Sequence, residues 1–121
     1  MSKTILIVDD SLSIRQLVKA TLVSEGYGVI DACDGQDALN KLSGQRVNLI
    51  ISDVNMPIMD GITFLRTLKS RPEHKFTPVV MLTTESQEAK KQEGQAAGAR
   101  AWIVKPFQPV QLLAAVQKLV M

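Results

Sequence analysis

Acidic, hydroxyl and amine side chains follow short apolar runs at four separate places in the sequence. These are Asp9-Asp10 after ILIV (5–8), Ser52-Asp53 after LII (49–51), Thr83-Thr84 after VVML (79–82) and Lys105 after WIV (102–104). A carboxylate next to a buried apolar run costs free energy unless a cation or a hydrogen-bond donor lies beside it. If the runs are strands of one parallel sheet, these polar residues meet at a single edge, where such sheets bind their ligands.

Three carboxylates gathered in this way repel one another unless a hard divalent cation lies among them, and oxygen ligands suit Mg²⁺. The charges of Asp9, Asp10 and Asp53 would be balanced by one Mg²⁺ and Lys105. A phosphoryl group on Asp53 would then add little net charge, with Lys105 as a point-charge partner for its oxygens. Because a carboxylate nucleophile can form an acyl phosphate, the cluster predicts phosphoryl transfer to Asp53. Taken singly, an Asp after a strand is usually a turn or helix-capping residue, and a lone Lys is usually a solvated surface charge.

The elements that would position these residues alternate along the chain. Five apolar runs are interpreted as strands, at 5–8, 29–30, 49–51, 79–82 and 102–104. Their almost continuous hydrophobicity favours a parallel sheet that is covered on both faces. Five strands alternating with helices predict an α/β fold with right-handed crossovers, in one domain over residues 1–121.

Helical periodicity and capping residues separate the predicted strands. The first helix is predicted by an apolar stripe at Ile14, Leu17, Val18, Thr21 and Leu22 that ends at Gly26, and the second by a capping Asp34. Asp60-Gly61 opens the third predicted helix, and the fourth is a polar helix over about 87–97. Pro109 lies in the first turn of the last predicted helix.

The composition excludes several classes of protein. The 121 residues are 45% hydrophobic and 21% charged, and their net charge of +2 is not arranged as a basic stripe for nucleic acid. No segment is typical of a signal peptide or a membrane span, and the single Cys33 suits a reducing compartment, so we expect a cytoplasmic protein. Cys33 is interpreted as a small buried hydrophobe, and His74 as an exposed loop residue. The start at Met1-Ser2-Lys3 is typical of a natural N-terminus, whereas truncation at the other end stays open.

Four segments, in order and at matching separations, resemble the receiver domains of bacterial two-component response regulators. The resemblance is greatest to the stand-alone chemotaxis regulators of the CheY type and covers essentially the whole chain. The segments are VDDS (8–11), SDVNMPIMDG (52–61), MLTTES (81–86) and GARAWIVKPF (98–107). The resemblance implies the flavodoxin-like (βα)5 fold, a doubly wound parallel sheet with strand order 2-1-3-4-5.

The resemblance also implies a role for each residue at the predicted edge. It implies that Asp53 accepts the phosphoryl group and that Asp9, Asp10, Asp53 and the backbone carbonyl of Asn55 bind the metal ion. It implies that Thr83 and Lys105 contact the phosphoryl group and that Thr83 and Trp102 are the switch residues. It also implies a cis peptide bond at Lys105-Pro106. The implied cofactor is Mg²⁺, with Mn²⁺ as an alternative ion.

The implied activity is transfer of a phosphoryl group from a histidine kinase to Asp53, followed by self-catalysed hydrolysis. The implied output is docking on a target protein, the flagellar motor switch in a chemotaxis regulator, and a phosphatase would be a further partner. Apart from this self-catalysed chemistry we expect no enzyme, no binding to nucleic acid or membrane, and a monomer.

Two features bear on the switch. Trp102 occupies a position where Tyr or Phe is more usual in the family, and it is either packed permanently or able to rotate between exposed and inward states. The segment QEAKKQEGQAA has only alanine as an apolar residue and a glycine at 94, so it is either a solvated surface helix or a marginal element suited to switching.

Other functions remain as alternatives. The chain could be a receiver excised from a larger regulator or hybrid kinase, or a scaffold that works without phosphorylation. A small-molecule phosphatase with an aspartyl-phosphate intermediate is a remote alternative, because such enzymes place a second acid two residues after the nucleophile, where this chain has Asn55.

Overall fold

A computed structural model describes residues 3–121, so the expectation that rests on Met1 and Ser2 lies outside the described residues. Within these described residues, five strands alternate with five α-helices. The elements are β1 (Thr4–Val8), α1 (Leu12–Val23), β2 (Gly28–Ala32), α2 (Gly35–Leu42), β3 (Leu49–Ser52), α3 (Gly61–Lys69), a 3-10 turn η1 (Pro72–His74), β4 (Val79–Thr83), α4 (Glu88–Ala97), β5 (Ala101–Val104) and α5 (Pro109–Leu119).

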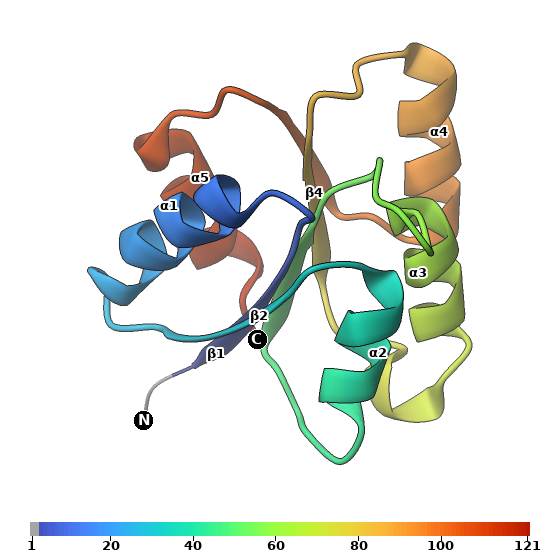
Figure 1. Ribbon diagram of the computed structural model, residues 1–121, viewed down its shortest axis with the longest axis horizontal. Coiled ribbons are helices and arrows are strands. Elements are labelled where there is room, and N and C mark those ends of the chain that lie inside the picture. The colour runs from blue at the N-terminus through green and yellow to red at the C-terminus, as the bar shows by residue number, and fades with distance from the viewer. Residues whose placement is uncertain (1–2) are drawn as a thin grey trace.

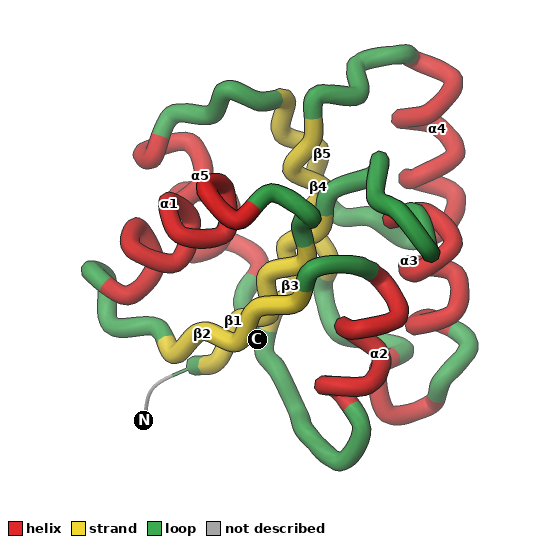
Figure 2. Tube along the Cα trace, viewed as in Figure 1, coloured by secondary structure: helices red, strands yellow, loops and turns green. Residues whose placement is uncertain are grey.

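The strands form one parallel sheet in the order β2-β1-β3-β4-β5, which confirms the predicted fold class and strand order. Helices α1 and α5 cover one face of the sheet, and α2, α3 and α4 cover the other (Figure 1). The strands lie between these two layers of helices (Figure 2). In the part of the chain that the structure describes, no helix has the length and apolarity needed to cross a membrane.

Each face of the sheet has its own hydrophobic core. Alternate residues of β1 divide between them, since Leu6 and Val8 join the core under α2 and α3, whereas Ile5 and Ile7 join the core under α1 and α5. The central strands are buried on both sides, which explains why they read as continuous apolar runs. Hydrophobic burial on both faces therefore fixes the strand ends that carry the polar residues.

The predicted helix starts are present. Asp34 and Asp60 cap α2 and α3 by accepting hydrogen bonds from backbone amides three residues on, and Pro109 lies in the first turn of α5. Gly98 ends α4 in the left-handed conformation that glycine favours.

Three expectations about burial were wrong. Leu17, placed in the inward stripe of α1, is exposed. The face of α1 that packs against the sheet is centred on Val18 and Leu22, its two fully buried residues. Cys33 is exposed, since it follows the end of β2 and precedes the capping residue of α2. His74 is only 3% exposed, because the segment of polar composition forms the turn η1, which packs against α3.

Candidate functional site

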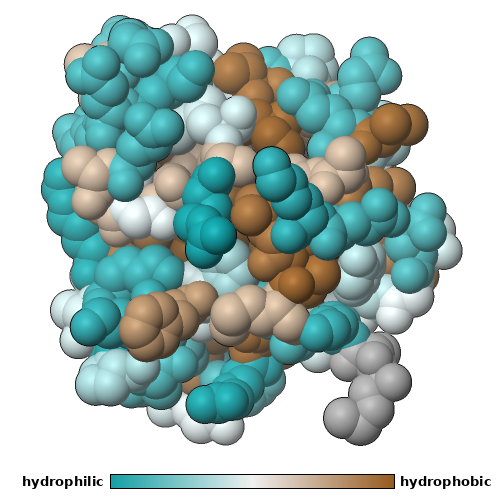
Figure 3. Space-filling view, turned by 180° about the vertical axis from the view of Figure 1, so that it is seen from behind, coloured by the Kyte–Doolittle hydropathy of each residue, from teal (hydrophilic) through white to brown (hydrophobic). Residues whose placement is uncertain are grey.

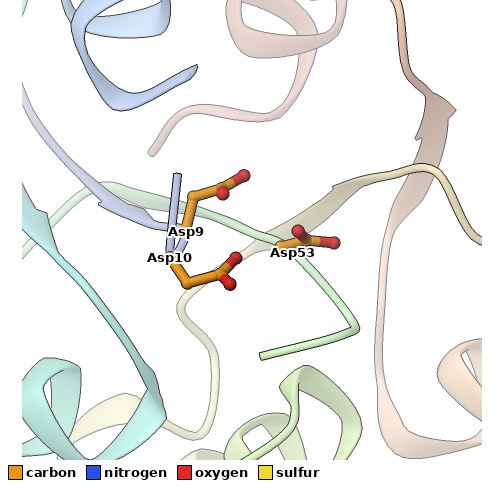
Figure 4. A group of neighbouring side chains, drawn as sticks. All are labelled: Asp9, Asp10 and Asp53. Atoms are coloured by element: carbon orange, nitrogen blue, oxygen red, sulfur yellow. The ribbon is translucent and has the colours of Figure 1, made fainter. Parts of the chain in front are cut away.

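The register of the sheet brings Asp9 and Asp53 side by side. Val8 of β1 pairs with Ser52 of β3, and each acid is the next residue along its strand. The side chains of Asp9 and Asp10 project from the end of β1 towards Asp53 (Figure 4). Each of the three acids offers an oxygen within 4.8 Å of the others. Asp9 and Asp53 are buried, whereas Asp10 is exposed.

Lys105, which follows β5, connects the two buried acids. Its Nζ donates to Oδ2 of Asp9 at 2.6 Å and to Oδ2 of Asp53 at 3.1 Å. Burial raises the pKa of Asp9, an effect that the nearby ammonium only partly offsets. Burial alone would lower the pKa of Lys105, but its contacts with the two carboxylates outweigh this and raise it. The amine therefore stays charged between the acids and neutralises part of their charge.

The backbone around Asp53 is held from two sides. Its Oδ1 accepts a hydrogen bond from the amide of Val54 at 2.7 Å, and its own amide donates to the carbonyl of Val8 at 2.9 Å. Gly61, the first residue of α3, lies so close that a Cβ there would be 1.9 Å from the carbonyl oxygen of Asp53. Only glycine permits this approach, which fixes the start of α3 against the loop that carries Asp53.

The loop between Asp53 and α3 has an unusual turn. Met59 donates its amide to the carbonyl of Pro57 at 2.7 Å, and the residue between them, Ile58, has a φ of 71°. Positive φ is costly for a β-branched residue. Asn55 lies exposed in the same loop, next to the acids in sequence.

Thr83 ends β4 with a fully buried side chain, in register with Val104, the residue before Lys105. Its hydroxyl accepts a hydrogen bond from the amide of Glu85 at 3.1 Å. The carbonyl of Glu85 in turn accepts from the indole Nε1 of Trp102 at 2.9 Å. The backbone of Glu85 therefore connects the two predicted switch residues.

The indole of Trp102 is half-buried and lies on Gly94 of α4. A Cβ at position 94 would be 2.7 Å from Cζ3 of the indole, so the absence of a side chain there makes room for the ring. The predicted cis peptide bond at Lys105-Pro106 is also present.

The donor set fits a hard divalent cation. Within residues 3–121, three carboxylates converge on one region and the ammonium of Lys105 is the single cation that contacts them, so negative charge remains. Carboxylate oxygens are the ligands that Mg²⁺ prefers, and one or two protein carboxylates with water commonly hold it. Asp9, Asp10 and Asp53 are the residues that could do so here.

Sequence reasoning missed two residues at this edge, Arg15 and Glu85, and the roles of two glycines that it had named. Arg15 donates to the backbone of Asp9, Glu85 connects Thr83 to Trp102, Gly61 admits the close approach to Asp53, and Gly94 accommodates the indole. Gly94 and Trp102 were each singled out, but eight residues of sequence separation gave no sign that they touch. A backbone group such as that of Glu85 leaves no signal in side-chain types.

Comparison with known proteins adds an independent line of support. The family model described as "Response regulator receiver domain" matches residues 5–117. A transcriptional regulatory protein of Staphylococcus aureus, SrrA, is 40% identical over 119 residues, which are 98% of this chain and 48% of SrrA. The chain thus spans about half the length of the curated relatives it matches.

Solved structures resemble the chain over nearly its whole length. The chemotaxis protein CheY4 of Vibrio cholerae superimposes with a TM-score of 0.94 and is 49% identical, covering 99% of this chain and 100% of CheY4. The receiver domain of the sensor histidine kinase PA1611 of Pseudomonas aeruginosa has a TM-score of 0.90 and 26% identity, with 98% of both chains covered. The latter structure has a magnesium ion coordinated in its active site cleft.

Proposed function

The chain belongs to the response regulator receiver domains of two-component systems, and we propose that it is switched by a phosphoryl group that a histidine kinase transfers to Asp53. Membership implies a histidine kinase as phosphodonor and Mg²⁺ bound at an acidic pocket. The observation that carries the proposal is the position of Lys105, whose ammonium lies between the carboxylates of Asp9 and Asp53.

The transfer is a substitution at phosphorus. A carboxylate oxygen of Asp53 attacks the phosphorus of the kinase phosphohistidine, the P–N bond breaks, and the imidazole nitrogen keeps the electron pair. Attack by water on the resulting acyl phosphate returns the Asp53 carboxylate and releases phosphate. Because little covalent chemistry is left to the protein, positioning and charge neutralisation dominate.

Each polar residue at the edge has a part in this proposal. Lys105 would exchange its hydrogen bond with Asp53 for one to a phosphoryl oxygen. Thr83 would turn its hydroxyl away from the amide of Glu85 and donate to a second phosphoryl oxygen. Asp9, Asp10 and Asp53, with the backbone carbonyl of Asn55, would hold Mg²⁺. When bound, the ion supplies positive charge to the phosphoryl oxygens.

The test is the intact mass of the protein after incubation with acetyl phosphate. We expect a single phosphoryl adduct that forms with MgCl₂ and not with EDTA, and that is absent from Asp53→Asn. Asp60→Asn, which alters an exposed helix cap outside the cluster, is the matched control and should still form the adduct. An adduct on Asp53→Asn, or no adduct on the wild type, would contradict the proposal and favour a scaffold that needs no phosphorylation.

We further propose an output by docking on a flagellar motor switch protein. The support is the likeness to CheY4, a chemotaxis protein that the chain matches from end to end. The surface near β5 and α5 has the apolar side chains that docking needs, since Val104 is 42% and Val110 79% exposed. Apolar surface also runs between hydrophilic side chains over the back of the molecule (Figure 3). Beryllofluoride should increase binding to the motor protein, and Val110→Glu should reduce it.

The likeness to SrrA favours a second role, as the receiver of a longer transcriptional regulator. We nevertheless propose that residues 1–121 act as a single receiver domain. No increase in binding to the motor protein with beryllofluoride would favour the role in a longer regulator. A small-molecule phosphatase would instead show turnover of a phosphate ester in excess over protein.

A further inference from the structure

Arg15, on the first turns of α1, holds the backbone between the two acids at the end of β1. Its Nη1 donates to the carbonyl oxygen of Asp9 at 2.6 Å. Its Nε donates to Oδ2 of Asp31 on β2 at 3.0 Å. Only 15% of the Arg15 side chain is exposed, whereas the carboxylate side chain of Asp31 is 38% exposed, so the bond to the backbone of Asp9 is the more shielded of the two. Side chains of a helix point back towards its N-terminus, which lets a residue of α1 reach the loop before it.

The carbonyl of Asp9 belongs to the peptide group that joins Asp9 to Asp10. Asp9 is fixed in other ways, because its amide donates to Ala32, its Oδ1 accepts from the amide of Ser11, and its Oδ2 accepts from Lys105. Within residues 3–121, the carboxylate of Asp10 has no hydrogen bond or ion pair to another residue. The orientation of Asp10 therefore depends on the peptide plane that Arg15 holds.

The charge of Arg15 would disfavour a cation bound nearby, but Asp31 balances it. The pair of Arg15 and Asp31 is neutral overall, and the carboxylate holds the guanidinium on the side of β2. A guanidinium presents several donors in a fixed plane and can bond the carbonyl and the carboxylate together. A lysine has a single nitrogen on a flexible chain and does not reproduce this arrangement.

We propose that Arg15 is a positioning residue for the divalent cation and that Asp31 is its counter-ion. The inference rests on the proposed function, since it takes Asp9 and Asp10 as ligands of Mg²⁺. Arg15 does not touch the ion. It sets the peptide group between the two ligands, so its loss should weaken the binding of Mg²⁺ before it affects any later step.

The test is calorimetric titration of the protein with MgCl₂ alone, with no phosphodonor present. Outer partners of metal ligands typically contribute about 10–100-fold to affinity, and we expect Arg15→Met to raise the Kd for Mg²⁺ by about tenfold. Arg15→Lys should also weaken binding. Asp31→Asn should weaken the binding of Mg²⁺ less than Arg15→Met does. It would leave the positive charge of Arg15 unbalanced, and the repulsion of the cation by this charge should diminish as salt is added. Arg66→Met, which removes an exposed arginine whose nearest acidic oxygen is 3.7 Å away, is the matched control and should leave the Kd unchanged.

Two further measurements separate positioning from a general effect on the fold. At saturating MgCl₂, Arg15→Met should form the acetyl phosphate adduct at close to the wild-type rate, because the defect is in affinity. If Arg15 only stabilised the fold, Arg15→Met would lower the melting temperature in EDTA and leave the Kd of the folded protein for Mg²⁺ unchanged. That result would overturn the inference. If Arg15→Met does not fold, Arg15→Lys and Asp31→Asn decide the question by the same comparison. A wild type that does not bind Mg²⁺ would instead contradict the proposed function itself.

Discussion

The indole Nε1 of Trp102 donates a hydrogen bond to the backbone carbonyl of Glu85, 2.9 Å away. The amide of the same Glu85 donates to the hydroxyl of Thr83, at the end of β4. A change in the hydrogen bond of Thr83 would therefore act on the segment that holds the indole. A phenylalanine at this position would have no donor for the bond, and a tyrosine would donate from the hydroxyl at the tip of its ring instead of from an indole N–H.

Trp102 should become less accessible when the proposed site is occupied by a phosphoryl mimic. The half-buried indole lies between Glu85 and Gly94, and ordering of the Glu85 segment would favour this inward position. Quenching of tryptophan fluorescence by acrylamide measures the change directly, because the chain has one tryptophan. Beryllofluoride with MgCl₂ should lower the quenching constant of the wild type, with no effect on Asp53→Asn. An equal constant in both states would show that the indole is packed permanently.

Gly94→Ala should move the indole outward. The new Cβ would lie 2.7 Å from Cζ3, closer than any normal contact, and the ring can shift more easily than the helix backbone. Alanine also favours a helix over glycine by about 1 kcal/mol, which offsets part of the packing loss. We expect red-shifted emission and stronger quenching, with little change in the free energy of unfolding. Gln92→Ala, at an exposed position of α4 outside the cavity beside the indole, is the control and should leave the emission unchanged.

Asp10→Asn should stabilise the protein in EDTA and remove its response to Mg²⁺. The exposed carboxylate lies within reach of two other acids, so removing its charge relieves repulsion when no cation is bound. An ion that binds only the folded state raises the melting temperature by mass action. MgCl₂ should therefore not raise the melting temperature of the variant, which lacks the Asp10 carboxylate. Thermal melts with and without MgCl₂ make both comparisons. A variant that MgCl₂ stabilises as much as the wild type would show that Asp10 is not a ligand.

His74 should make the protein less stable as the pH falls from about 7.5 to 5. Burial lowers the pKa of His74 below its ordinary value of 6.5, and the cations of Arg71, Arg46 and Lys69 act in the same direction, while Glu73 acts against it. The unfolded chain therefore binds a proton that the folded chain does not, and stability is lost at up to about 1.4 kcal/mol per pH unit. The contribution of Asp9 has the opposite sign at lower pH: because its pKa is raised in the folded state, its protonation favours the folded protein as the pH falls.

Urea unfolding at several pH values tests this prediction. The difference in unfolding free energy between pH 7.5 and pH 5.5 should be smaller in His74→Gln than in the wild type. Equal pH dependence in both proteins would assign the effect to other groups.

The strand ends were predictable because buried strands leave apolar runs that are visible in any single sequence. Asp9, Asp53 and Lys105 could be brought together from the sequence, since parallel strands end at a common edge. The burial of His74 could not, because its segment is polar and the side chain is removed from water by tertiary packing around η1, which contacts α3. The contact between Gly94 and Trp102 was hidden for a related reason: local pattern does not report which faces of α4 and β5 meet.

The most direct test of the central claim is to locate the phosphoryl group chemically. Borohydride reduces an acyl phosphate to the corresponding alcohol, which converts an aspartyl phosphate into homoserine. After incubation with acetyl phosphate and MgCl₂, reduction and peptide mass spectrometry, we predict homoserine at position 53 alone. Homoserine at position 9 or 10, or at no position in protein that has formed the adduct, would contradict the assignment of Asp53 as the acceptor.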